Sequence, residues 1–106
     1  MTDKIVVLTT AGSETEARKL AQELVERKLA ACVNIMPRIQ SVYRWEGKVE
    51  SAEEFLLLIK TTKSRFPDLQ SAIRELHSYE LPECVLISMD AGSEEYLKWI
   101  DESVQR

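Results

Sequence analysis

A long alternating segment in the middle of the chain constrains the fold more than any other feature. Six apolar or aromatic residues between Ala31 and Trp45 fall on odd positions: Val33, Ile35, Pro37, Ile39, Tyr43 and Trp45. A period of two places such side chains on one face of a β-strand. Glu46 and Gly47 then supply a two-residue turn, and "KVESAEEFLLLIKTT" returns as a second strand. The segment therefore predicts a long β-hairpin.

Two features of this hairpin carry structural consequences. Pro37 has no backbone N–H, so we expect the strand to bulge or bend there, or to lie at a sheet edge. Each arm, at ~14 residues and ~3.3 Å per residue, spans on the order of 45 Å, whereas a domain of this size is roughly 35 Å across. The hairpin should overhang the domain and expose Tyr43, Trp45 and open strand edges. Such surfaces are usually covered by another copy of the chain, which predicts a symmetric homo-oligomer.

The flanking segments complete an α+β pattern. "KIVVLTT" is a short β-branched strand, and Ser13 and Glu16 form a capping box before a helix that ends near Lys28. A second helix starts near Pro67 and a third follows Ser93, with "CVLISM" between them as a further long strand. The predicted order is β-α-β-β-α-β plus a C-terminal helix: a ferredoxin-like antiparallel sheet with two helices on one face.

Composition excludes several classes of protein. With 106 residues and 44% hydrophobic side chains, the chain should form one domain over residues 1–106. A net charge of −4 leaves no basic stripe for nucleic acid. There is no apolar run of the roughly 18 residues that a membrane span needs, and no secretory signal pattern, so we expect no membrane partner and a cytoplasmic location. Cys32 and Cys84 lie outside any CxxC spacing and should be reduced thiols.

Five dispersed segments together resemble one known family. They are "ERKLAACVNI", "SVYRWEGKVE", "LLLIKTT", "HSYELPECVLI" and "YLKWI", and they occur in the order found in the CutA family of divalent-cation tolerance proteins. The resemblance implies a ferredoxin-like subunit, a tight homotrimer in which the long hairpins pair between neighbours, and an architecture similar to that of PII signalling proteins. It also implies a role in tolerance of divalent metal ions such as copper, exercised by binding and without a required cofactor.

The resemblance suggests metal ligands only in part. Some relatives bind copper through a cysteine in the first strand and a histidine pair near the end of the second helix. Here those positions hold Thr9, Leu76 and His77, so one ligand of three is kept. His77 and Cys32, which matches a cysteine common in the family, are the candidate metal residues, for weakly bound copper or another divalent cation. The alternatives are a core thiol for Cys32 and, for His77, a polar residue in a last helical turn that complements the helix dipole.

The segment "SYELPE" suggests a second candidate site. Tyr79, Pro82 and Glu83 match a family Tyr-x-x-Pro-Glu pattern at the subunit clefts, although Pro82 is also explained as a stop to the preceding helix. By the same resemblance Trp45, Lys60, Tyr79 and Glu80 form a candidate pocket between two subunits that would hold a small molecule. The alternative is that these residues make interchain hydrogen bonds and packing contacts.

Other functions known for this fold lack their motifs. The loop "TTAGS" has no CxxC for a soft metal ion, and "EEFLLLIKT" is not an RNA-binding strand. "TAGSETEAR" is too acidic and has too few glycines for a phosphate loop, and nothing singles out a nucleophile for His77. We therefore predict a binding protein and not an enzyme. A PII-like small-molecule sensor or scaffold, and a hydrolase that uses the intersubunit cleft, remain as alternatives.

Overall fold

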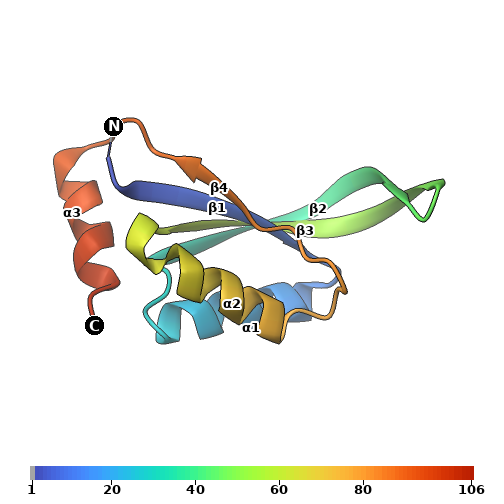
Figure 1. The fold of residues 1–106 in the computed structure, drawn as a ribbon, viewed down its shortest axis with the longest axis horizontal. Coiled ribbons are helices and arrows are strands. Elements are labelled where there is room, and N and C mark those ends of the chain that lie inside the picture. Colours follow the sequence, from blue (N-terminus) through green and yellow to red (C-terminus); the bar gives the residue numbers. More distant parts are fainter. Residues whose placement is uncertain (1) are drawn as a thin grey trace.

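The first half of the chain forms a strand, a helix and a long hairpin. The computed structural model describes residues 2–106. Its elements here are β1 (Lys4–Ala11), α1 (Glu14–Glu26), β2 (Cys32–Trp45) and β3 (Lys48–Thr62). The alternating pattern of the sequence thus forms a strand of 14 residues facing one of 15. Figure 1 shows that the outer part of this hairpin projects well beyond the rest of the molecule. The whole chain, hairpin included, measures 44 × 25 × 23 Å.

The second half adds helices and one short strand. These elements are η1 (Lys63–Arg65), α2 (Phe66–Leu76), β4 (Val85–Ser88) and α3 (Glu94–Ser103). The sequence predicted a long strand over "CVLISM", and this was wrong in its length. Pairing of β4 with β1 begins only at Val85, opposite Leu8, because the chain before Val85 has not yet joined the sheet. Among residues 2–106 no helix is both long and apolar enough to span a membrane.

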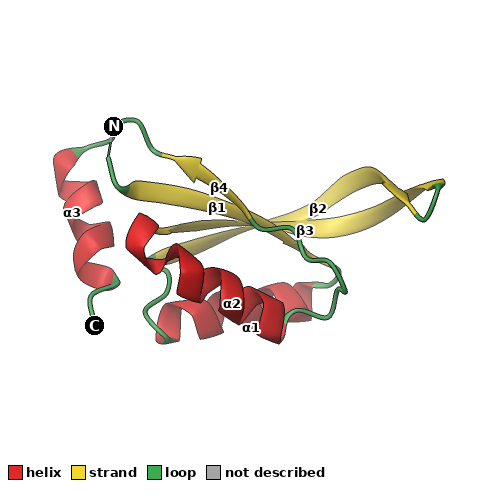
Figure 2. Ribbon diagram, in the orientation of Figure 1, coloured by secondary structure: helices red, strands yellow, loops and turns green. Residues whose placement is uncertain are grey.

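The four strands form one antiparallel sheet in the order β2-β3-β1-β4. Helices α1 and α2 lie side by side on one face of it, as Figures 1 and 2 show. The main core fills the space between them, with Ile5, Val7, Leu57 and Ile59 from the strands fully buried. Helix α3 lies at the end of the sheet away from the hairpin and packs through Ile100 and Val104 on a separate small cluster. The predicted α+β fold is therefore confirmed.

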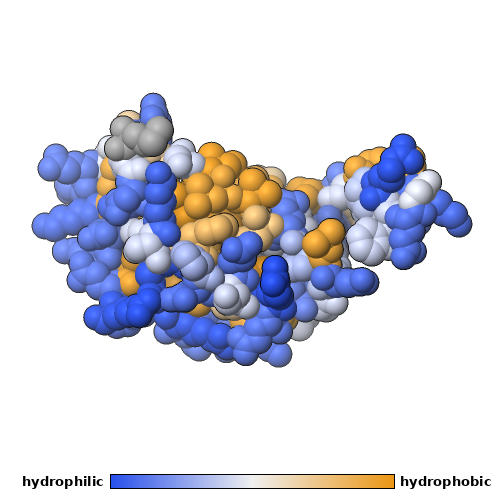
Figure 3. Space-filling model, in the orientation of Figure 1, coloured by the Kyte–Doolittle hydropathy of each residue, from blue (hydrophilic) through white to orange (hydrophobic). Residues whose placement is uncertain are grey.

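The opposite face of the sheet carries apolar side chains that no helix covers. Side chains alternate between the two faces of a strand, so the residues between the core positions point to this face. The register of the paired strands brings six of them together: Val6, Leu8, Leu56, Leu58, Val85 and Ile87. Val85 and Ile87 are each 49% exposed. An apolar patch is visible over this part of the sheet in Figure 3. Exposed apolar surface of this kind marks an interaction site in soluble proteins.

The predicted bulge at Pro37 is confirmed. The register of β2 against β3 shifts between Met36 and Ile39, so that Pro37 and Arg38 together oppose one residue of β3. Arg38 has a φ of 57°, in the left-handed region. The predicted two-residue turn is also present, with positive φ at both Glu46 (50°) and Gly47 (81°), as a type I′ turn requires.

The ends of α1 show one expected and one unexpected feature. The Ser13 hydroxyl accepts a 3.1 Å hydrogen bond from the Glu16 N–H, as predicted. The Glu16 carboxylate, however, accepts from Ser78 instead of completing the capping box, because the chain after α2 offers it two donors. At the other end Lys28 has a φ of 59°, and the N–H groups of Lys28 and Leu29 donate back into the last turn in a Schellman arrangement.

Candidate functional site

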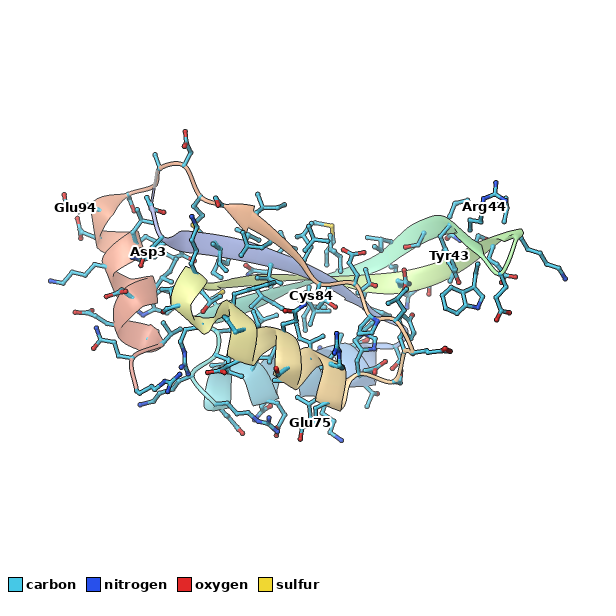
Figure 4. All side chains as sticks on the ribbon, in the orientation of Figure 1. Asp3, Tyr43, Arg44, Glu75, Cys84 and Glu94 are labelled. Carbon is cyan, nitrogen blue, oxygen red and sulfur yellow. The ribbon has the colours of Figure 1, made fainter. Side chains whose placement is uncertain are left out.

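A cavity of about 610 Å³ lies where the hairpin leaves the body of the protein. The outer part of β2 forms one wall, the end of β1 forms the floor, and the loop that follows α2 forms the other wall. Figure 4 shows Tyr43 on the projecting hairpin and Cys84 on the body, on either side of this junction. The cavity is lined by Thr10, Ser41, Val42, Tyr43, Trp45, Glu54, Tyr79, Glu80, Leu81 and Glu83.

Tyr79 and Glu54 form the polar centre of this cavity. The Tyr79 hydroxyl donates a 2.7 Å hydrogen bond to Oε2 of Glu54, whose residue is only 7% exposed. Burial, and then this bond to a carboxylate, raise the pKa of Tyr79 far above its ordinary value. Gly12 packs closely beside it, and a Cβ at that position would lie 3.0 Å from the Tyr79 hydroxyl oxygen. The close approach of the chain at Gly12 therefore positions the phenol.

His77 lies directly behind Tyr79, with both ring nitrogens bonded to the backbone. Its Nδ1 accepts a 3.0 Å hydrogen bond from the Tyr79 N–H, so the ring proton is on Nε2 and is donated to the Thr10 carbonyl oxygen at 2.6 Å. The side chain is fully buried, and its ring lies 4.6 Å from that of Tyr79. His77 thus joins the end of β1 to the loop after α2. In this arrangement neither ring nitrogen has a free lone pair for a metal ion.

A second contact fixes the same loop. The Glu16 carboxylate accepts from the Ser78 N–H at 2.8 Å and from the Ser78 hydroxyl at 3.0 Å, and its Oε2 lies 3.7 Å from Nδ1 of His77. Partial burial opposes ionisation of Glu16, but the two hydrogen bonds from Ser78 outweigh it, and the pKa of Glu16 is lowered. The loop that walls the cavity is therefore held by the start of α1 as well as by His77.

The two candidate metal residues lie apart within one chain. Cys32 pairs with Lys60 in the sheet, level with Val6 of β1, whereas His77 contacts β1 at Thr10. Four residues along a strand amount to about 13 Å, too far for one ion to join the two. Residues 2–106 contain no group of three or more His, Cys, Asp or Glu side chains with the geometry of a metal site. Thr9, which the resemblance places where some relatives have a cysteine, is fully buried.

The candidate ligand residues divide into two places. Trp45, Tyr79 and Glu80 line the cavity together. Lys60 is six residues along β3 from Glu54, about 20 Å away, and its ammonium group contacts the Asn34 side chain. Sequence reasoning missed Glu54, the buried carboxylate at the centre. Its position next to the apolar run of β3 has no special pattern, and only the tertiary contact with Tyr79 distinguishes it.

The arrangement brings together side chains that can bind a ligand. Three aromatic rings and three carboxylates face one cavity, while the histidine nearby has both nitrogens engaged by backbone. In this arrangement His77 has no free ring nitrogen with which to act as a general base. The fold and the site thus define a small α+β protein with a ligand-sized cavity at the root of a hairpin.

Comparisons with known proteins agree with this class. The model of the family "CutA1 divalent ion tolerance protein" matches residues 5–103. A "Divalent-cation tolerance protein CutA" of Thermus thermophilus is 49% identical over 98 residues, which are 92% of this chain and 95% of that protein. A chloroplastic CutA of Arabidopsis thaliana is 45% identical over 95% of this chain and 56% of its own length. A solved CutA1 structure from Thermus thermophilus superposes with a TM-score of 0.94, at 47% identity, over 96% of this chain and 99% of that one.

The chain belongs to the CutA1 divalent ion tolerance family. The family name suggests a non-catalytic role in tolerance of divalent cations.

Proposed function

We propose that this protein acts as a homotrimer that contributes to divalent-cation tolerance by binding and not by catalysis. The observation that carries the proposal is family membership over nearly the whole chain, together with the uncovered apolar face of the sheet. A tolerance protein need only sequester or sense its ion, and neither task requires catalysis.

The trimer is supported by three surfaces that one chain leaves open. The sheet face around Leu8, Val85 and Ile87 has no helix over it, and β2 and β4 are both edge strands. The hairpin projects from the body with Trp45 39% exposed near its tip. A symmetric assembly covers all three at once, with the hairpin of one copy against its neighbour.

Copper or another divalent cation would bind weakly. His77 becomes a ligand only if it gives up its hydrogen bond to Thr10 or to Tyr79, and Cys32 of the same chain is too distant to assist. A neighbouring chain would have to supply the remaining donors. We also propose a cytoplasmic location, which suits the two free cysteines, Cys32 and Cys84.

The cavity favours a second candidate function, a PII-like sensor or scaffold for a small molecule. Its volume lies within the range of roughly 300–1,000 Å³ usual for ligand pockets. Trp45, Tyr79 and Glu80 are the binding residues in this proposal, with Lys60 contributed by a neighbour. Metal tolerance would then follow indirectly from the response to that molecule.

Light scattering tests whether the protein is a trimer, and calorimetry tests how tightly it binds copper. We expect a mass three times the 12.2 kDa of the chain. Ile87→Lys places a charge on the uncovered sheet face and should give a smaller species, while Lys98→Glu, on the exposed side of α3, should leave the trimer intact. A wild-type monomer would contradict the trimer. Copper should be titrated into metal-free wild type and metal-free His77→Ala. Tight binding to both proteins would contradict the proposed weak site.

A further inference from the structure

The cavity at the root of the hairpin contains a buried carboxylate that has no cationic partner among residues 2–106. Glu54 is 93% buried, and Oε2 accepts from the Tyr79 hydroxyl. No Lys, Arg or His side chain of residues 2–106 lies within 4.0 Å of its carboxylate, and Oε1 accepts no hydrogen bond from them. A buried carboxylate without a positive partner is costly, and such groups are normally paired. Within one chain the cavity therefore lacks a positive charge to pair with Glu54, and either a ligand or Lys60 of a neighbouring chain supplies it.

The other lining residues indicate what kind of cation fits. Glu80 and Glu83 add two more carboxylates, and Tyr43, Trp45 and Tyr79 contribute aromatic rings. Aromatic faces attract ammonium groups by cation–π interaction, most strongly where water is excluded. A combination of carboxylates and aromatic rings is the usual recognition chemistry for organic ammonium groups, and it is a poor one for anions.

A bare metal ion does not suit this cavity. A divalent ion needs several oxygen ligands at about 2.0–2.6 Å from one point. The carboxylates here form no such group, since residues 2–106 contain no cluster of three or more acidic, His or Cys side chains able to hold one ion. The volume of about 610 Å³ is also that of a molecule, not of an ion.

From these observations we infer that the cavity binds an organic ammonium compound, with an amino group at Glu54 and the carbon skeleton against the aromatic rings of Tyr43 and Trp45. This inference rests on the small-molecule alternative under the proposed function and names the ligand class for that site. The Tyr79 hydroxyl keeps Oε2 occupied, so Oε1 receives the ammonium group. Glu80 and Glu83 add charges at the rim and favour compounds with more than one amino group.

Isothermal titration calorimetry on the assembled wild-type protein tests this directly. The probes are spermidine, tetramethylammonium, and 1,5-pentanediol as a neutral compound. We expect spermidine to bind more tightly than tetramethylammonium, and the diol not to bind. Glu54→Gln keeps a hydrogen-bond acceptor for Tyr79 but removes the charge, and should weaken spermidine binding at least about tenfold. Trp45→Leu should weaken it severalfold, about fivefold, through loss of the cation–π contact.

Glu53→Gln is the matched control, because it removes the same charge from the adjacent, exposed position of β3 and lies outside the cavity. Its spermidine affinity should stay within about twofold of wild type. If Glu53→Gln and Glu54→Gln weakened spermidine binding equally, the effect would arise from the overall charge of the protein, and the inference would be overturned. So would binding of the diol, the absence of binding by any ammonium probe, or displacement of spermidine by Cu²⁺ or Mg²⁺ in a manner that depends on Glu54.

Light scattering on the same samples separates this inference from the proposed function. If the protein is not trimeric yet binds spermidine through Glu54, the assembly proposal fails and the ligand class stands. If the trimer forms and spermidine does not bind, a neighbouring chain supplies the cation, and the inference is wrong while the trimer stands.

Discussion

Nε2 of His77 donates a 2.6 Å hydrogen bond to the carbonyl oxygen of Thr10, across 67 residues of sequence. The bond joins the loop after α2 to the last residues of β1, next to the cavity. The same ring accepts from the Tyr79 N–H, so one side chain holds both the floor and a wall of the site. His77 is therefore a structural residue of the cavity in the isolated chain.

The first prediction concerns this link. His77→Ala leaves the Thr10 carbonyl and the Tyr79 N–H without partners in a buried place, which should lower the free energy of unfolding by about 2 kcal/mol. Urea denaturation at a fixed protein concentration measures the change. Arg74→Ala, on the exposed side of α2, is the control and should stay within about 0.5 kcal/mol of wild type. A similarly small effect for His77→Ala would mean that the ring is not needed to hold the loop.

The second prediction is a dependence of stability on pH through Glu16. Because its pKa is lower in the folded state than the ordinary 4.5, the carboxylate stabilises the fold above pH 4.5. That contribution disappears as the pH falls through the folded value. Glu16→Gln should therefore lower the melting temperature at neutral pH and differ less from wild type in acid.

Thermal melts of both proteins across this pH range check the sign. Glu14→Gln, which changes an exposed carboxylate on the same helix turn, should show a smaller difference at neutral pH. A gap between wild type and Glu16→Gln that widens on acidification would contradict the depressed pKa.

The third prediction concerns ionisation of the tyrosines. The protein has three tyrosines, and the pKa of Tyr79 is raised first by burial and then by its bond to Glu54. Near pH 11, about one unit above the ordinary value of 10.0, Tyr79 should still be protonated in the native state. Ultraviolet titration should therefore show incomplete tyrosinate formation until the protein unfolds. Tyr79→Phe should remove this late component, and an unchanged titration curve would assign it to another tyrosine.

The fourth prediction concerns the end of α1. Lys28 has a φ of 59°, where a side chain is disfavoured and glycine is not. Lys28→Gly should raise the free energy of unfolding by up to about 1 kcal/mol, despite the added freedom of the unfolded chain. Lys19→Gly, at an exposed position inside the same helix, should lower it by about 1 kcal/mol. Equal losses for both variants would show that the left-handed conformation of Lys28 carries no strain.

Patterns among residues close in sequence were enough to predict the main helices and strands and the long hairpin. The alternation from Ala31 to Trp45 predicted β2, and Glu46 and Gly47 predicted its turn. Pro37 predicted a bulge, a bend or an edge position, because a residue without an N–H cannot donate a hydrogen bond to a neighbouring strand. These features depend on residues close together in sequence, so they can be predicted without knowledge of the tertiary structure. The strand over "CVLISM" was predicted too long because its length depends on where the chain joins and leaves the edge of β1.

The site was only partly predictable. Trp45, Tyr79 and Glu80, which were grouped on the strength of a resemblance and not of a local pattern, line one cavity of the single chain. Lys60 lies elsewhere in the same chain, and Glu54 was not foreseen. Its role depends on Tyr79, 25 residues later in the chain.

The sequence by itself determined the period of each segment, the positions of its turns and bulge, and the family. Only the tertiary structure decided which polar groups are buried and with what partners. The contacts of Glu16 with Ser78, Glu54 with Tyr79 and His77 with Thr10 all join residues distant in sequence. The physical reason is that burial and hydrogen bonding depend on distances in space, and the packing of the whole chain sets those distances.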